Sequence, residues 1–279
     1  MRGSPALLRA RARGAGRVGV KTPSVRSIAS RDNPLLVRLR KLGRDPVAYR
    51  KLGELWIEGD HLCRAFLQRG GVPLQAVISE EGWDSPLRDL ALQAPVVSVL
   101  PAGLLSSVSA LESPTPMGFV VPWVRVTDVH PDAASIVLDR LQDAGNVGTI
   151  LRSASAFGFT QVLALKGTAG LCSPKVLRAG MGAHFGLSLV EGVEPADLHA
   201  LASPLLATSS HASQAIHEVA LPWPCVWVLG HEGEGVSAAL QSQCSLTLRI
   251  AQPGGEESLN VGAATAICLY ESARQRLGR

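Results

Sequence analysis

Residues 135–152 read SIVLDRLQDAGNVGTILR and combine a short strand, a glycine-bearing turn and the start of a helix. The run Ser135–Leu138 is apolar without alternation, which is typical of a strand that is covered on both faces of a parallel sheet. We expect a helix at 147–157 that Asn146 caps and that carries Arg152 in its second turn. Because ligands bind beyond the carboxyl ends of parallel strands, the turn is a candidate binding loop.

The rest of the second half continues this alternation of strands and helices. Apolar runs predict further strands near 161–165, 187–190, 205–207, 225–229 and 247–250. Helical patterns fit between them at 174–180, 195–201, 236–241 and 260–276. This alternation predicts the α/β class, with a mostly parallel sheet that helices cover on both faces.

The first half alternates in the same way and predicts a second, smaller α/β unit. A helix begins at Asn33–Pro34, and Phe119–Trp123 has the pattern of an exposed strand. Between them we expect strands at 54–57, 74–78 and 96–100 and helices at 59–68 and 85–92. We therefore expect a basic, disordered extension over 1–25, a small α/β domain over 26–125, a polar linker, and a second domain over 132–279.

Composition excludes several classes of protein. The 279 residues are 46% apolar and 18% charged, which is too apolar and too sparsely charged for a disordered chain. The longest stretch without charge, 90–111, contains Pro95 and Pro101, so it does not predict a membrane-spanning helix. The 5 cysteines form no C-x-x-C pair, which argues against a zinc knuckle or a disulfide framework and favours a reducing compartment. The histidines show no ligand spacing, so we expect no metal.

Positive charge is concentrated at the amino-terminal end. Residues 1–51 contain 14 Lys and Arg against two acidic residues, a footprint expected of nucleic-acid binding. On the helix that begins in this region, Arg38, Arg40 and Lys41 are candidate RNA-binding residues. Residues 1–31 lack the apolar core of a secretory signal. An RNA-contacting arm, an organellar transit peptide and an upstream extension all remain open for them.

Two more glycine-rich loops follow predicted strands. The loop VLGHEGEGVS at 228–237 has three glycines, which let a ligand approach the backbone closely. The loop IAQPGGEESLNV at 250–261 leads into the last predicted helix, with Ser258 and Asn260 at its start. Taken singly, turn formation and helix capping explain each loop.

Taken together and in this order, the three loops resemble the SpoU (TrmH) family of RNA ribose methyltransferases, within the SPOUT class. The similar motifs are Asn146-x-Gly148-x-x-x-Arg152, Leu229-Gly230-x-Glu232-Gly233-x-Gly235 and Ile250-x-x-x-Gly254-x-x-Glu257-Ser258-Leu259-Asn260-Val261. Further similarity lies in Ser30–Pro34, Ile57–Leu62, Ser113–Gly118 and Pro174–Gly182, and resembles family members that carry an amino-terminal substrate-binding domain.

The resemblance implies a fold and a set of site residues. The fold is a parallel sheet whose carboxyl-terminal segment forms a trefoil knot, a rare exception to the unknotted rule. The residues implied to contact the cofactor S-adenosyl-L-methionine are Thr208, Leu229, Gly230, Gly235, Ile250 and Leu259. Those implied to act in catalysis are Arg152, Asn146, Glu232, Ser258 and Asn260, and Arg178 joins the candidate RNA-binding cations.

Three residues depart from the family pattern. Ala144 and Ala251 stand where proline is usual, and His231 stands where the family often has asparagine. Loss of a fixed φ at two positions changes stability by about 0.4–1 kcal/mol each, which is too little to abolish a site.

The function implied by the resemblance is methylation of a ribose 2′-hydroxyl in structured RNA, with ribosomal RNA favoured over transfer RNA. Arg152 is expected to stabilise the developing alkoxide while a phosphate or water takes the proton, because a guanidinium with a pKa above about 12 is a poor base. We expect a homodimer through the last helix, no membrane contact, and a cytoplasmic location, or an organellar matrix if residues 1–31 are a transit peptide.

This function has two alternatives, and the second fails on its sequence context. One is a non-catalytic RNA-binding or assembly protein that keeps the knotted fold, which the joint presence of the catalytic residue types disfavours. The other is a nicotinamide-dependent oxidoreductase, suggested by the G-x-G-x-x-G pattern at Gly14–Gly19, but no predicted strand precedes that pattern.

Overall fold

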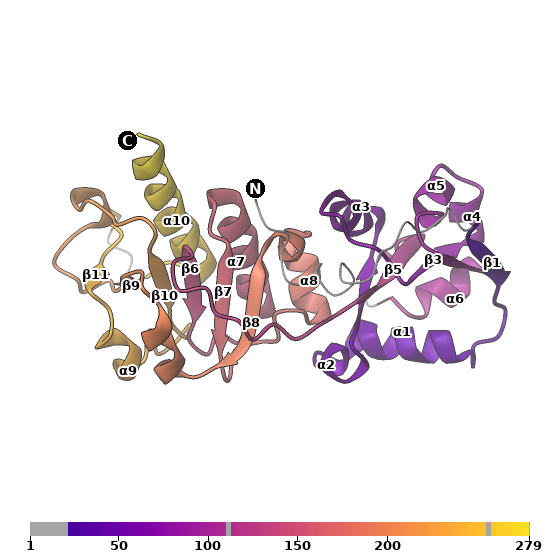
Figure 1. Cartoon of the computed structure of the whole chain (residues 1–279), viewed down its shortest axis with the longest axis horizontal. Helices are drawn as coiled ribbons and strands as arrows, with labels where there is room; N and C mark the ends of the chain where they lie inside the picture. Colours follow the sequence, from indigo (N-terminus) through magenta and orange to yellow (C-terminus); the bar gives the residue numbers. More distant parts are fainter. Residues whose placement is uncertain (1–21, 110–112, 255–257, 279) are drawn as a thin grey trace. The chain divides into compact units, whose positions relative to one another are not determined.

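The strand quoted above belongs to a six-stranded parallel sheet, and the quoted loop and helix follow that strand (Figure 1). In the computed structural model, which describes residues 22–109, 113–254 and 258–278, the strand order is β11-β9-β10-β6-β7-β8. The strands are β6 (Ser135–Leu138), β7 (Gln161–Leu165), β8 (Ser188–Val193), β9 (Leu205–Thr208), β10 (Val226–Leu229) and β11 (Leu246–Leu248). Every neighbouring pair is parallel, so the carboxyl ends of all these strands lie along one edge. The predicted α/β class with a parallel sheet is confirmed, and the knot stays a prediction.

Two helices of this part of the chain pack tightly on each other. They are α7 (Ala144–Phe157) and α10 (Val261–Leu277), and a Cβ atom on Gly262 would lie only 3.2 Å from Thr149 Cγ2. The buried Trp227 of β10 joins α10 to the sheet, because its Nε1 donates a hydrogen bond to Ser272 Oγ at 3.0 Å. The shorter helices of this part are the 3₁₀ helices η3 (Pro195–Ala200) and η4 (Ile216–Glu218), and α9 (Ala238–Gln241).

Two expectations about these helices are wrong. Helix α7 begins earlier than predicted because Asp143, not Asn146, is its amino-terminal cap: Asp143 Oδ1 accepts a hydrogen bond from Asn146 N at 2.7 Å. Arg152 consequently lies in the third turn of α7. The helix predicted at 195–201 is a 3₁₀ helix, in which hydrogen bonds join residues three apart, as from Leu201 N to Leu198 O at 3.0 Å.

The chain divides into two compact units. The described residues up to Arg125 group with Cys172–Phe185, and Val126–Leu171 group with the residues from Gly186 onward. The second unit holds the six-stranded sheet. The segment Cys172–Phe185, which was expected in the second domain, belongs to the first unit. There the Phe185 ring packs edge to face on the Phe66 ring, with the ring centroids 5.1 Å apart.

The first unit has its own mixed sheet, with the strand order β1-β4-β3-β5-β2. Its strands are β1 (Ser24–Ser27), β2 (Glu54–Glu58), β3 (Gln75–Ser79), β4 (Val96–Leu100) and β5 (Met117–Pro122). Its helices are α1 (Pro34–Arg44), α2 (Ala48–Leu52), α3 (Asp60–Gln68), α4 (Glu80–Trp83), α5 (Leu87–Ala91), α6 (Ala102–Ser106) and α8 (Pro174–Gly180), and the 3₁₀ helix η2 (Ala183–Gly186) begins in its last segment.

Two sequence expectations for the first unit need correction. The strand expected to be exposed at 119–123 is instead β5, which is buried because it lies between β3 and β2 and pairs with both. The proposed disordered extension over 1–25 reaches too far, since Ser24 and Val25 already pair with β4. The strand β1 was missed because all its side chains are exposed and its sequence has no apolar pattern. Residues 1–21, which include Gly14–Gly19, lie outside the described residues.

Within the described ranges, every helix is too short or too polar to span a bilayer.

Candidate active site

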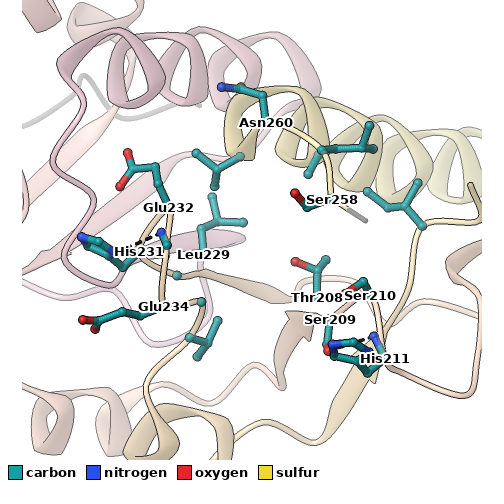
Figure 2. Close-up of a pocket in the computed structure, with 18 of the residues that line it drawn as sticks. Thr208, Ser209, Ser210, His211, Leu229, His231, Glu232, Glu234, Ser258 and Asn260 are labelled. Atoms are coloured by element: carbon teal, nitrogen blue, oxygen red, sulfur yellow. Dashed lines mark hydrogen bonds between the residues drawn. The ribbon is translucent and has the colours of Figure 1, made fainter. Parts of the chain in front are cut away.

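A pocket of about 660 Å³ opens at the carboxyl ends of three adjacent strands of the second unit. Thr208 and Leu229 are the last residues of β9 and β10, and Ile250 follows β11. Figure 2 shows Thr208 to His211 on one side of the pocket, His231, Glu232 and Glu234 on the opposite side, and Ser258 and Asn260 at the approach to α10. The pocket therefore forms where loops distant in sequence converge.

The loop after β10 approaches itself so closely that only glycine fits at its first position. A Cβ atom on Gly230 would lie 2.0 Å from Gly235 C and 2.1 Å from Val236 N, which is inside the backbone of the returning chain. The turn is closed by a hydrogen bond from Gly235 N to His231 O at 2.8 Å, and Gly235 has a φ of 71°, which glycine adopts without strain. The glycines of this motif thus shape the wall of the pocket.

Glu232 connects this loop to the loop after β6. Its carboxylate accepts hydrogen bonds from Asp143 N at 3.2 Å, from Gln142 N at 3.4 Å and from Asn146 Nδ2 at 3.2 Å. Burial alone would raise the pKa of the Glu232 carboxyl, but these backbone and side-chain donors outweigh that effect and lower it. Glu232 is therefore a carboxylate at neutral pH that holds two loops together through amide groups.

Asn146 and Asn260 extend this connection to the third loop. Asn260 Nδ2 donates to Asn146 Oδ1 at 2.9 Å, while Asn260 Oδ1 accepts from Gly262 N at 2.9 Å and from Ala263 N at 3.2 Å. Asn260 is thus the amino-terminal cap of α10, as the sequence indicated. The series Glu232, Asn146 and Asn260 joins all three motif loops and brings the starts of α7 and α10 together.

A second set of contacts, absent from the sequence analysis, holds the loop after β10 from behind. The buried Asp139 follows β6 directly, and its Oδ2 accepts from Ser237 N at 2.7 Å. Arg140 donates from Nε to Asp139 Oδ1 at 2.9 Å and from Nη1 to Glu234 Oε2 at 2.8 Å. Arg140 also has a positive φ of 60°, which is uncommon for a residue other than glycine. The sequence signal for these contacts was the pair of opposite charges, Asp139 and Arg140, directly after the buried strand β6.

The structure places most of the sequence-predicted site residues at this pocket. The predicted residues that line it are Thr208, Leu229, Gly230, Glu232, Gly235, Ile250, Ser258, Leu259 and Asn260. Lining residues that the sequence analysis did not select include Ser209, Ser210, His211, Gln241 and Gln252. They lacked a sequence signal because they are ordinary polar residues outside the glycine motifs.

Arg152 differs from the rest of the predicted set. It is exposed on α7 and does not line the pocket, and its side chain makes no hydrogen bond or ion pair with another residue that the structure describes. Asn146 is not among the lining residues either, but it touches two of them, Glu232 and Asn260.

The predicted RNA-binding cations lie in the first unit. Arg38 forms an ion pair with Glu54 at 3.4 Å, and Arg40 donates to Arg31 O at 3.2 Å and to Ser107 Oγ at 3.3 Å, so part of their hydrogen-bonding capacity is used within the unit. Lys41 is exposed on the same helix, α1. Arg178 lies in the last turn of α8 and is half-buried.

Comparison with known proteins agrees with this geometry. A model of the SpoU rRNA Methylase family matches residues 133–270, the part of the chain that contains the pocket. An uncharacterised tRNA/rRNA methyltransferase of Synechocystis is 31% identical over 264 residues, which cover 91% of this chain and 96% of that protein. The 23S rRNA (guanosine(2553)-2′-O)-methyltransferase of Bacillus subtilis is 28% identical over 225 residues, covering 79% and 88%.

A solved structure shows that the fold is shared. It is an rRNA methyltransferase from Sinorhizobium meliloti with bound AdoMet, which is S-adenosylmethionine. It matches with a TM-score of 0.79 at 24% sequence identity, covering 91% of this chain and 98% of that one.

Proposed function

Because this chain belongs to the SpoU rRNA methylase family, we propose that it transfers a methyl group from S-adenosyl-L-methionine to a ribose 2′-hydroxyl of ribosomal RNA. The observation that carries the proposal is the convergence of the three motif loops on one pocket, joined by Glu232, Asn146 and Asn260. The non-catalytic alternative loses its basis, since both the family and its named relatives are methyltransferases.

The residues present fit the cofactor. A volume of about 660 Å³ is within the range of small-molecule sites, and Leu229, Ile250 and Leu259 offer apolar surface for an adenine ring. Gly230 keeps the wall free of a side chain, so that backbone groups are within reach of a ligand. When bound, S-adenosylmethionine supplies an electrophilic methyl group on a sulfonium sulfur.

We assign the handling of the ribose to residues at the rim of the pocket. Ser258 and Asn260 are proposed to orient the sugar, while Glu232 keeps Asn146 and the start of α7 in place. Arg152 is always a cation and is exposed, so we propose that it binds a phosphate beside the target ribose and stabilises the developing alkoxide. A phosphate oxygen or water then accepts the proton, because a guanidinium does not.

RNA recognition is proposed for the first unit, through the exposed cations of α1 such as Lys41. We also propose a homodimer that forms through α10, because Ile267 and Tyr270 on this helix are 39% and 55% exposed, respectively. The proposed compartment is one that contains ribosomal RNA, either the cytoplasm or the matrix of an organelle.

The test is to incubate the protein with S-adenosylmethionine labelled on its methyl group and with total RNA. We expect the label in ribosomal RNA, at linkages that resist alkaline hydrolysis because the 2′-oxygen is methylated. Label on the bases would contradict the proposed reaction, and label in transfer RNA alone would contradict the proposed substrate.

A further inference from the structure

The imidazole of His231 closes the turn that forms one wall of the pocket. Its Nδ1 accepts a hydrogen bond from Gly233 N at 3.1 Å, and its backbone oxygen accepts one from Gly235 N at 2.8 Å (Figure 2). Side chain and backbone of one residue therefore both hold the turn 231–235. The side chain is half-buried and lines the pocket.

This turn determines two features of the site. It carries Glu232, whose carboxylate holds Asn146 and the start of α7, and its end returns to within 2.0 Å of the place where a Cβ atom of Gly230 would lie. A change in the turn would therefore move both the Glu232 contacts and the wall beside Gly230.

The hydrogen bond from Gly233 requires one protonation state of the ring. A neutral imidazole has one nitrogen that accepts and one that donates, so acceptance at Nδ1 places the ring proton on Nε2. A protonated imidazole donates from both nitrogens and has no acceptor left for Gly233 N–H.

We infer that His231 is a positioning residue whose uncharged ring holds the 231–235 turn in the form that binds S-adenosylmethionine, so that the protein loses affinity for this cofactor on acidification. The inference rests on the proposed function, because it takes the pocket to be the cofactor site. His231 acts through the turn and needs no contact with the reacting atoms.

The charged groups around the turn favour the same outcome. Glu232 and Glu234 follow His231 on the turn itself, and Asp139, Arg140 and Asp143 lie on the segment that these two glutamates contact. Arg140 is engaged by Asp139 and Glu234. A protonated ring bears a charge of the same sign as the positive end of the Gly233 N–H bond and is repelled by it, while the net negative charge of these neighbours favours the protonated form.

Asparagine is the informative replacement at this position. Its Oδ1 can accept a hydrogen bond from the backbone N–H two residues further along, and this acceptor does not titrate. His231→Asn should keep the turn at every pH, whereas His231→Ala removes the acceptor altogether. His199→Asn is the matched control, since His199 is exposed on η3 and does not line the pocket.

The experiment measures the dissociation constant of S-adenosylhomocysteine by calorimetry for these four proteins, from about pH 5.5 to about pH 8, the range in which histidine changes its charge. At a given pH the probe has the same protonation state for every protein. The ratio of the dissociation constants of wild type and His231→Asn therefore isolates the contribution of residue 231. We expect a ratio near one at the upper end and about 3–10-fold weaker binding by the wild type at the lower end, the effect of one net hydrogen bond. His231→Ala should bind more weakly than wild type at the upper end, and His199→Asn should follow the wild type throughout.

Parallel binding curves for wild type and His231→Asn would overturn the inference, as would tight binding by His231→Ala at the upper end. Circular dichroism at each pH shows whether the variants are folded. If the wild type binds S-adenosylhomocysteine and methylates RNA but the curves are parallel, only the role of His231 is refuted. If no protein in the set binds this probe at any pH, the proposed function itself fails.

Discussion

Replacement of Gly230 by alanine would place a methyl group inside the backbone of the turn that follows it. The new Cβ would lie 2.0 Å from Gly235 C, 2.1 Å from Val236 N and 2.3 Å from Gly235 O. Non-bonded carbon atoms approach favourably to about 3.5–4.0 Å, so the turn must move by roughly 1.5 Å. Overpacking of this kind costs about 1–3 kcal/mol of stability, and a displacement of about 1 Å in a reacting site lowers activity by about 10²-fold.

Gly233→Ala in the same loop is the matched control. The nearest atom to a Cβ at Gly233 is His231 Nδ1 at 3.8 Å, an ordinary van der Waals contact. We expect Gly230→Ala to lose at least about 10²-fold in methyl transfer and most of its S-adenosylhomocysteine affinity, and Gly233→Ala to remain within about threefold of wild type. Calorimetry and transfer of a labelled methyl group measure both, and thermal unfolding gives the stability change. Equal binding and activity in the two variants would refute the reasoning from close approach.

Three further predictions address the residues around this loop. Asp139→Asn should lower the free energy of unfolding by about 1–3 kcal/mol near neutral pH, because Asp139 is the buried acceptor for Arg140 and Ser237. Burial raises the pKa of Asp139, but these donors outweigh that effect and lower the pKa below its ordinary value. The stabilisation is therefore lost as pH falls through the folded-state pKa. Denaturant titrations should show the unfolding free energies of the two proteins converging below about pH 4. Asn260→Asp keeps the acceptor that caps α10 but loses the donor to Asn146. Methyl transfer should therefore fall about tenfold, while the free energy of unfolding changes by less than about 0.5 kcal/mol. A large loss of stability with unchanged activity would show that capping is the only role of Asn260. Arg152→Ala should reduce methyl transfer by about 10²–10³-fold without changing S-adenosylhomocysteine affinity, and Arg152→Lys should retain part of the activity; complete loss in the lysine variant with intact RNA affinity would point to a bidentate contact instead.

The pocket shows what the sequence could predict. Glycines after buried strands indicate loops that carry function, and Gly230, Glu232 and Asn260 do line one pocket. This works because parallel strands of one sheet place their carboxyl ends along one edge, so residues distant along the chain meet there. The sequence of a single loop does not predict the order of the strands in the sheet, which the structure shows.

Other features depended on interactions that no local pattern contains. Asn146 was expected to cap α7 because it precedes an apolar helical run, but Asp143 takes that role and leaves the Asn146 side chain for Glu232 and Asn260. Asp139 and Arg140 pair with each other, but their contacts to Ser237 and Glu234 depend on the return of the loop after β10, which no local pattern predicts.

The segment Cys172–Phe185 has a consequence for biosynthesis. Although it follows the first strands of the second unit in sequence, it completes the first unit, where Phe185 meets Phe66 and Gly182 leaves room beside Ala65. A ribosome must therefore translate part of one unit before it delivers the last piece of the other. Until residue 185 has left the exit tunnel, the first unit therefore lacks the Phe185 ring that packs on Phe66.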